Sequence, residues 1–382
     1  MTTLPQGFSG AGVAVGIKKS GDRDLALIVN NGPQKFATAV FTSNRIEAAP
    51  VTWSRQVVRD FEVSAIILNS GGANACTGPE GFADTHKTAE TVANKLNLNA
   101  GDVIVCSTGL IGVRLPMDKV LSGIDSAIDH LDSENAEQLA EAIMTTDSKS
   151  KYISIESHGA KFFGIAKGAG MLAPSLATML SVITTDAVVD SKSADEIFRK
   201  VCSETFDRID SDGCMSTNDT VTLMASGASG VALTPDQLYE ALYEICDYLS
   251  KELIGDAEGH TKIVEIVTRN AATVEDAVEV GRSCARNNLL KCALNGEDPN
   301  WGRVLAAIGT TKAAFDPLLI DVSLNGIMVC KSAGVGEDRD LCDLSGQRIR
   351  IEIDLKAGKE EATIWTNDLS AMYVHENSSY SS

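Results

Sequence analysis

Residues 102–108 read DVIVCST, a short run of β-branched and apolar residues that ends in two small hydroxyl residues. A run of this length, bounded by polar residues, predicts a buried β-strand. SAIILNS (64–70) and LLIDVSL (318–324) have the same form. RIRIEIDL (348–355) and TKIVEIVT (261–268) instead alternate between polar and apolar residues, which is typical of a strand with one exposed face.

Helical patterns lie between these predicted strands. Thr234-Pro235-Asp236-Gln237 has an N-cap residue, a proline at the first helical position and a glutamine at the third, which predicts a helix start. A second helix is expected from Thr273, a third over about 117–131 and a fourth over about 134–144. The polar stretch 147–161 predicts a loop or an edge hairpin. Strands and helices alternate along the whole chain, so the fold class is α/β or α+β.

Composition narrows the class of protein. The 382 residues carry 33 basic and 52 acidic side chains, a formal charge of −19, which disfavours binding to nucleic acid or to an anionic membrane. The N-terminal residues lack the pattern of a signal peptide, and no apolar run reaches the ~18 residues that a membrane span needs. The nine cysteines are scattered and odd in number, which favours free thiols in a reducing cytoplasm.

Familiar catalytic patterns are missing from the sequence. None of the five histidines lies in a hydrolase or metalloprotease motif, no His/Cys cluster has metal-ligand spacing, and neither a Rossmann nor a P-loop glycine pattern occurs. The stretch KGAGMLAPSLATML (167–180) holds a candidate nucleophile, Thr178, but no side chain close before it in sequence could serve as its base. Cleavage of the Ala177–Thr178 bond would solve this, because a free α-amine with a pKa of about 7.7–8.0 could then activate the hydroxyl. The alternative interpretation is a helix start with Pro174 in its first turn and Thr178 half-buried.

Eight stretches of the chain are long and specific enough to be compared with known families. They are NSGGANACTG (69–78), CSTGLIGVRLPMDK (106–119), AIMTTD (142–147), KGAGMLAPSLATML (167–180), STNDTV (216–221), AEGHTK (257–262), GEDPNWGRV (296–304) and YVHENSSYSS (373–382). In these stretches, and from about residue 5 to the end, the chain resembles the ornithine acetyltransferases of arginine biosynthesis, also called glutamate N-acetyltransferases.

The resemblance implies a fold and an activity. It implies a layered αββα sandwich that cuts itself between Ala177 and Thr178 into an α chain (1–177) and a β chain (178–382), which assemble as α2β2. Thr178 would take the acetyl group from N2-acetyl-L-ornithine and pass it to L-glutamate in a ping-pong reaction. No cofactor is implied, and the sequence leaves open whether acetyl-CoA is a second acetyl donor.

The resemblance also assigns an oxyanion hole to Thr108 and Gly109. A hydroxyl and a backbone N–H at the end of a strand can each stabilise the developing negative charge by about 3–4 kcal/mol. Read without the resemblance, Ser107-Thr108-Gly109 is an ordinary turn at the end of a strand.

Substrate recognition is implied for six residues. These are Thr145, Lys167, Thr178, Glu258, Asn377 and Ser382. A lysine suits a substrate carboxylate and a glutamate suits an ammonium group. The chain departs from the family pattern at His260 and at His375-Glu376, which affects the expected binding of substrate and not the nucleophile.

Two other functions remain open on the sequence. A self-cleaving aminopeptidase or amidase of similar fold would share Thr178 and the oxyanion pair, and would differ in using water to resolve the acyl-enzyme. A non-enzymatic α/β scaffold would leave Thr178 in the core and the chain uncut.

Overall fold

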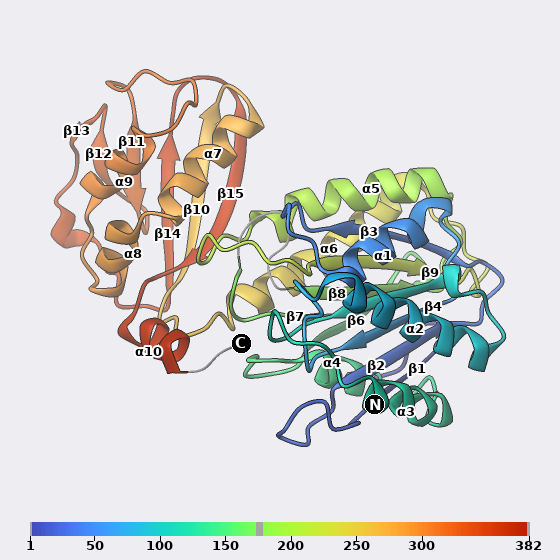
Figure 1. Cartoon of the computed structure of the whole chain (residues 1–382). Helices are drawn as coiled ribbons and strands as arrows, with labels where there is room; N and C mark the ends of the chain where they lie inside the picture. Colours follow the sequence, from blue (N-terminus) through green and yellow to red (C-terminus); the bar gives the residue numbers. More distant parts are fainter. Residues whose placement is uncertain (1, 173–178, 380–382) are drawn as a thin grey trace. The chain divides into compact units, whose positions relative to one another are not determined.

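The computed structural model describes residues 2–172 and 179–379, and these form two compact units (Figure 1). Unit 1 comprises Met1–Asp207 and Cys214–Asp256, and unit 2 comprises Arg208–Gly213 and Ala257–Ser381. The boundary at Asp256 means that the β chain expected from residue 178 onward would contribute to both units.

Unit 1 is built on two β-sheets. In sheet order, the four-stranded sheet consists of β1 (Phe8–Val13), β2 (Leu25–Asn30), β4 (Ala65–Asn69) and β5 (Val103–Ser107). The five-stranded sheet consists of β3 (Phe36–Phe41), β9 (Thr220–Ala225), β8 (Leu180–Thr185), β7 (Ala160–Lys167) and β6 (Lys151–Ser157). Two pairs are parallel, β4 with β5 and β8 with β9, and the other pairs are antiparallel.

The two sheets of unit 1 pack face to face and are covered by helices on their outer faces. One core cluster joins Ile66, Leu68 and Ile104 of the first sheet to Phe163 and Val182 of the second. On the other face of the first sheet, a separate cluster joins alternate strand residues to α2 and α3. Helices α5 and α6 contact the second sheet. Because both faces of β4 and β5 are covered, their sequences are continuous apolar runs.

The helices of unit 1 connect these strands. They are α1 (Ala49–Val57), α2 (Gly78–Leu96), α3 (Met117–Asp129), α4 (Glu137–Ile143), α5 (Ser191–Glu204) and α6 (Pro235–Ile254). Helix α6 begins as its sequence predicts, with a capping box between Thr234 and Gln237, and its apolar stripe from Leu238 to Leu249 is buried.

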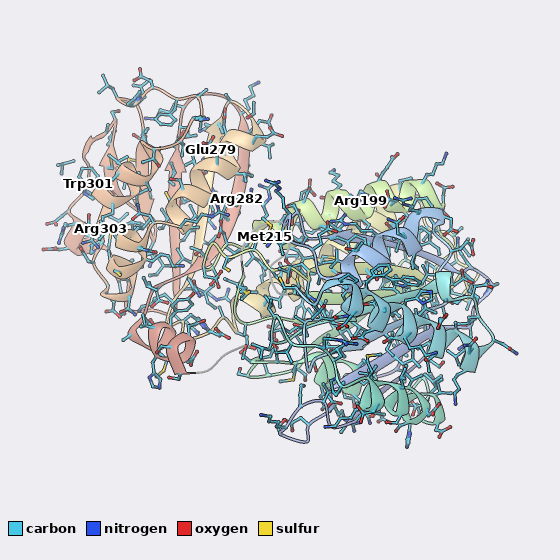
Figure 2. All side chains as sticks on the ribbon, viewed as in Figure 1. Arg199, Met215, Glu279, Arg282, Trp301 and Arg303 are labelled. Carbon is cyan, nitrogen blue, oxygen red and sulfur yellow. The ribbon has the colours of Figure 1, made fainter. Side chains whose placement is uncertain are left out.

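Unit 2 contains one six-stranded sheet. In sheet order its strands are β13 (Gly334–Val335), β12 (Ile327–Lys331), β11 (Asp321–Leu324), β14 (Arg348–Asp354), β10 (Ile263–Ala271) and β15 (Glu360–Asn367). Its helices are α7 (Val274–Ala285), α8 (Asn288–Asn295), α9 (Trp301–Ile308) and α10 (Ala371–Ser379). Helices α7, α8 and α9 share one core cluster with the sheet. Trp301 of α9 packs at the edge of that cluster, and Figure 2 labels it together with Arg282 of α7.

The sequence predictions of individual elements are confirmed. All five predicted strands are present, β14 alternates between buried and partly exposed residues, and the polar stretch 147–161 contributes to the hairpin of β6 and β7 at a sheet edge. The helix expected over 134–144 is shorter, Glu137–Ile143. The αββα layering is found in unit 1. Unit 2 consists of one sheet packed against helices, and the sequence patterns did not predict where this unit begins.

Two further properties of the structure concern the cysteines and the possibility of a membrane-spanning helix. No disulfide joins the cysteines of the described ranges, and five of these cysteines are buried. Among the described residues, no helix is both long and apolar enough to cross a membrane.

Candidate active site

The predicted oxyanion pair lies at the carboxyl end of β5. Thr108 follows the last residue of this strand and is buried, and its backbone N–H donates to the Asn69 carbonyl at 3.0 Å. Gly109 has φ +129°, and a Cβ there would lie 2.8 Å from the Gly72 nitrogen. Only glycine fits this backbone and this spacing, so the local structure requires a glycine after Thr108.

A buried lysine contacts this pair. Lys167 is the last residue of β7 and is 1% exposed, and its Nζ lies 3.3 Å from Thr108 Oγ1. An ammonium group only donates hydrogen bonds, so the Thr108 hydroxyl accepts here and its own hydrogen is not used in this contact.

Asp147 holds two of the predicted substrate-binding positions together. Its Oδ2 accepts from the Thr145 N–H at 2.9 Å, and its Oδ1 accepts from the Gly168 N–H at 2.7 Å, next to Lys167. The Oδ1 atom also accepts from Lys151 Nζ at 2.6 Å. Thr108, Thr145 and Lys167 therefore lie in one connected region of unit 1.

The charges around Asp147 determine its protonation. Burial alone would raise the pKa of Asp147, but the charges of Lys167 and Lys151 and the hydrogen bonds from Lys151 and Thr145 lower it to about 2. Lys151 is fully buried and also pairs with Asp256 at 2.5 Å. Asp147 is therefore an anion at neutral pH, and it offsets the cationic charge buried beside the predicted oxyanion pair.

The predicted cleavage site, Ala177–Thr178, lies outside the described residues. The chain is described again from Met179, whose N–H donates to Asp219 Oδ1 at 2.8 Å. Asp219 belongs to the stretch 216–221, and the preceding Asn218 Nδ2 donates to the carbonyls of Ala73 and Ser107 at 2.6 and 2.8 Å. This stretch thus contacts both the residue after Thr178 and the residue before Thr108.

The remaining predicted residues belong to the C-terminal part of the chain. Glu258 is buried in the loop before β10, and Asn377 lies on α10, where its Nδ2 donates to the Tyr373 carbonyl at 3.1 Å. Ser382 lies outside the described residues. The Ser370 hydroxyl donates to the Gly259 carbonyl, which fixes the start of α10 beside the Glu258 loop within unit 2.

Sequence reasoning did not assign a role to Asp147, although it lies inside the stretch AIMTTD that carried the family resemblance. For Ser216-Thr217-Asn218-Asp219 the sequence suggested either a helix cap or support of the nucleophile, and the structure shows which backbone groups Asn218 binds. Among residues 2–172 and 179–379, no group of three or more His, Cys, Asp or Glu side chains could hold a metal ion.

The chain is similar to known proteins over nearly its whole length. The family model described as "ArgJ family" matches residues 9–382. The "Arginine biosynthesis bifunctional protein ArgJ" of Streptomyces avermitilis is 60% identical over 380 residues, which is 100% of this chain and 99% of the relative. The protein with the same description from Thermobifida fusca is 54% identical over 99% of both chains.

Solved structures also match. Ornithine acetyltransferase of Mycobacterium tuberculosis, solved in complex with ornithine, is 49% identical and covers 44% of this chain and 92% of its own, with a TM-score of 0.40. An arginine biosynthesis bifunctional protein from Bacillus halodurans is 32% identical and covers 52% of this chain and 97% of its own, with a TM-score of 0.49. With TM-scores below 0.5, these two carry no weight in the assignment.

The near-complete sequence matches place the chain among the acetyltransferases of arginine biosynthesis. It belongs to the ArgJ family.

Proposed function

We propose that this acetyltransferase works through an acetyl ester on Thr178, formed after the chain cuts itself between Ala177 and Thr178. The acetyl donor is N2-acetyl-L-ornithine and the acceptor is L-glutamate. The observation that supports this most strongly is the contact of Lys167 Nζ with Thr108 Oγ1, because it leaves a buried hydroxyl ready to donate at the end of a strand.

The proposed transfer has two halves. The free α-amine of Thr178 takes the hydroxyl proton, and the oxygen attacks the acetyl carbon of acetylornithine. The bond between that carbon and the ornithine nitrogen breaks, and the nitrogen leaves with the proton. The amine of glutamate then attacks the ester, its lost proton returns to the Thr178 oxygen, and N-acetylglutamate leaves.

Each attack places a negative charge on the acetyl oxygen. We assign its stabilisation to the Thr108 hydroxyl and the Gly109 N–H. Lys167 strengthens the Thr108 donor, because a hydroxyl that accepts from a cation is a better donor itself. Asp147 keeps the local net charge low enough for a cation to be buried there.

Substrate binding is assigned on the resemblance and on side-chain chemistry. Lys167 and Thr145 suit the α-carboxylate, and Glu258 suits the ammonium group of ornithine. Asn377 and Ser382 would add hydrogen bonds from the C-terminal segment. The relatives named for arginine biosynthesis support amino-acid substrates of this class.

The proposal also covers a second acetyl donor, the assembly of the two chains and the location of the protein in the cell. The word "bifunctional" in the relatives' names supports acetyl-CoA as a second acetyl donor. The proposed chemistry needs neither a metal nor a prosthetic group, since an amine supplies the base. We propose an α2β2 assembly on the resemblance, and a cytoplasmic location because the cysteines of the described ranges form no disulfide.

The first test is the intact mass of purified wild-type chain beside the Thr178→Ala variant. The wild type should give two fragments, ending at Ala177 and starting at Thr178, and the variant should stay whole. The cleaved protein should then transfer acetyl from acetylornithine to glutamate faster than it releases acetate to water. Faster release of acetate would instead identify a hydrolase, and an uncut wild-type chain would contradict the proposed nucleophile.

A further inference from the structure

The two loops that follow β4 and β5 lie against each other beside the predicted oxyanion pair. These strands are parallel neighbours, so both loops leave the same edge of the sheet. The Thr108 N–H donates to the Asn69 carbonyl at 3.0 Å. A Cβ on Gly109 would lie 2.8 Å from the Gly72 nitrogen, which shows how closely the loops approach. The geometry of the pair therefore depends on how the two loops are held together.

The side-chain amide of Asn218 joins the two loops. Its Nδ2 donates to the Ala73 carbonyl at 2.6 Å and to the Ser107 carbonyl at 2.8 Å. Ala73 is the chain neighbour of Gly72, and Ser107 is the chain neighbour of Thr108. Each of the two hydrogen bonds is therefore one residue away from the place where the loops meet.

The direction of the Asn218 amide is fixed by a third partner. The Thr217 hydroxyl donates to Asn218 Oδ1 at 2.6 Å, so the amide oxygen faces this hydroxyl and the amide nitrogen faces the two carbonyls. The opposite orientation would point Oδ1 at two carbonyl oxygens, which have no hydrogen to donate. The side chain is buried, so water does not compete for these bonds.

The backbone around Asn218 is held on both sides. The Thr217 carbonyl accepts from the Ala48 N–H at 2.9 Å, and the Asp219 carbonyl accepts from the Thr42 N–H at 3.0 Å. Both donors belong to the segment between β3 and α1, which is separate from the two loops that the amide joins. Asn218 is thus anchored independently of the loops whose spacing it sets.

We propose that Asn218 is a positioning residue for acetyl transfer, which sets the spacing between the Thr108 hydroxyl and the Gly109 N–H. The inference rests on the function proposed above, since it takes these two groups to be the oxyanion hole. Asn218 acts through the two loops and not on the substrate. Two donors at a preset spacing stabilise an oxyanion without reorganising, and a displacement of about 1 Å can lower a catalytic rate about 10²-fold.

Asn218→Asp tests the proposal because it keeps the size of the side chain and replaces the amide nitrogen by oxygen. A carboxylate cannot donate to the carbonyls of Ala73 and Ser107, so the loops lose their link. We expect kcat per cleaved chain to fall about 10²-fold with little change in KM. Steady-state kinetics with acetylornithine and glutamate measure both constants. Intact mass gives the cleaved fraction, and urea denaturation shows whether the variant is folded.

Asn30 is a matched control at the other end of β9. It is buried, and its Nδ2 also donates to two backbone carbonyls, those of Gln34 and Ala225, at 3.0 and 3.1 Å. Ala225 is the last residue of β9, whereas Asn218 precedes the strand. The length of the strand therefore separates the two amides, about 17 Å at ~3.3 Å per residue. Asn30→Asp should lower the free energy of unfolding and leave kcat per cleaved chain unchanged.

A double variant shows whether Asn218 acts through the oxyanion pair. The spacing of two donors has no effect on the rate once one donor is missing. In a Thr108→Val chain, Asn218→Asp should therefore lower kcat by less than about tenfold, in contrast to its effect in the wild type. A purely structural role of Asn218 would lower kcat by the same factor in both chains and would overturn the proposal.

The remaining results separate this inference from the function on which it rests. Wild-type kcat in Asn218→Asp, together with a slow Thr108→Val enzyme, would overturn the positioning role alone. If Asn218→Asp does not fold or cleave, Asn218→Ala also lacks the amide and should show the same fall in kcat. Failure of both variants to fold or cleave would show a purely structural need and overturn the proposal. Full activity of Thr108→Val would instead contradict the oxyanion hole of the proposed function.

Discussion

The Thr108 hydroxyl has one hydrogen and therefore serves one acceptor at a time. Because Lys167 donates to its oxygen, that hydrogen is not used in this contact and could serve the oxyanion of the proposed reaction. The side chain is buried and its backbone is tied to Asn69, so little reorganisation is needed during the reaction. At the scale of single residues, activity should therefore depend strongly on this hydroxyl.

Replacing Thr108 by valine tests this dependence. Valine keeps the branched shape and removes the hydroxyl, so we expect kcat per cleaved chain to fall about 10²–10³-fold with a small change in KM. Steady-state kinetics with acetylornithine and glutamate measure kcat and KM. Thr108→Ser, which restores a hydroxyl, should recover most of the activity. An unchanged kcat in the valine variant would remove Thr108 from the oxyanion hole.

Asp147 should matter for stability as well as for the site. It accepts hydrogen bonds from Thr145, Gly168 and Lys151, and the first two lie at or beside predicted substrate positions. Asp147→Asn removes the negative charge and leaves buried cations less compensated. We expect a loss of about 3–5 kcal/mol in the free energy of unfolding at neutral pH, measured by urea denaturation. The control is Asp22→Asn at an exposed position, which should not change the free energy of unfolding comparably.

The contribution of Asp147 should also depend on pH in a defined direction. Its folded pKa of about 2 is below the unfolded value of about 3.9, so its stabilisation is present above pH 4. It is lost as the pH falls toward 2, where both states bind the proton. The stability difference between wild type and Asp147→Asn should therefore shrink over this interval. A difference that stays constant with pH would contradict the assigned pKa.

At the scale of elements, α10 is held against the Glu258 loop by close backbone contact. Gly259 has φ +59°, and a Cβ there would lie 2.2 Å from the Tyr373 nitrogen. The Tyr373 N–H donates to the Ser370 hydroxyl at 3.0 Å, and that hydroxyl donates to the Gly259 carbonyl. This contact brings the loop that carries Glu258 and the helix that carries Asn377 together.

Gly259→Ala should displace the start of α10. We expect a rise in KM for acetylornithine of about tenfold or more, because the added methyl group cannot fit without moving the helix. Gly230→Ala is the control: Gly230 also has a positive φ, +71°, but a Cβ there meets no atom within 4 Å. Equal kinetic effects of the two substitutions would show that backbone strain, and not the contact with α10, is responsible.

Individual strands and helices were predictable from the sequence because the residues that specify each of them are close together in the chain. The capping box at Thr234 and the apolar runs of β4 and β5 each specify structure within a few residues. The resemblance supplied the layered sheets and the residues Thr108, Gly109, Thr145 and Lys167. The structure brings Thr108, Thr145 and Lys167 together in unit 1, and the functional roles of all the predicted site residues remain predictions.

Long-range pairing was not predictable in the same way. Asp147 binds the Gly168 N–H, and Asp219 binds the Met179 N–H, 21 and 40 residues away in sequence. Such contacts depend on which strands become neighbours, and strand order is not encoded in periodicity. The separation of residues 257–381 as a second unit also escaped prediction, because no linker of distinct composition marks it.

At the scale of the whole molecule, the proposed cleavage would leave two interlocked chains. The sheet order β3-β9-β8-β7-β6 places two strands of the β chain between strands of the α chain. Antiparallel pairing of β3 with β9 and of β7 with β8 gives each chain a long ladder of backbone hydrogen bonds with the other. Separation would require breaking the sheet.

The fragments should therefore stay together until the protein unfolds. We expect both fragments to co-elute on size-exclusion chromatography in 1 M salt, since apolar packing and backbone hydrogen bonds resist screening. A denaturing gel of the same fractions should resolve them. Elution of a free α chain under native conditions would contradict the sheet order.

In the proposed reaction, every acetyl group passes through Thr178. The most direct measurement is peptide mass spectrometry of cleaved enzyme incubated with acetylornithine alone, followed by addition of glutamate. We predict one acetyl group on the peptide that begins at Thr178, and its disappearance with formation of N-acetylglutamate when glutamate is added. No acetyl group on that peptide, or one that glutamate does not remove, would contradict the account.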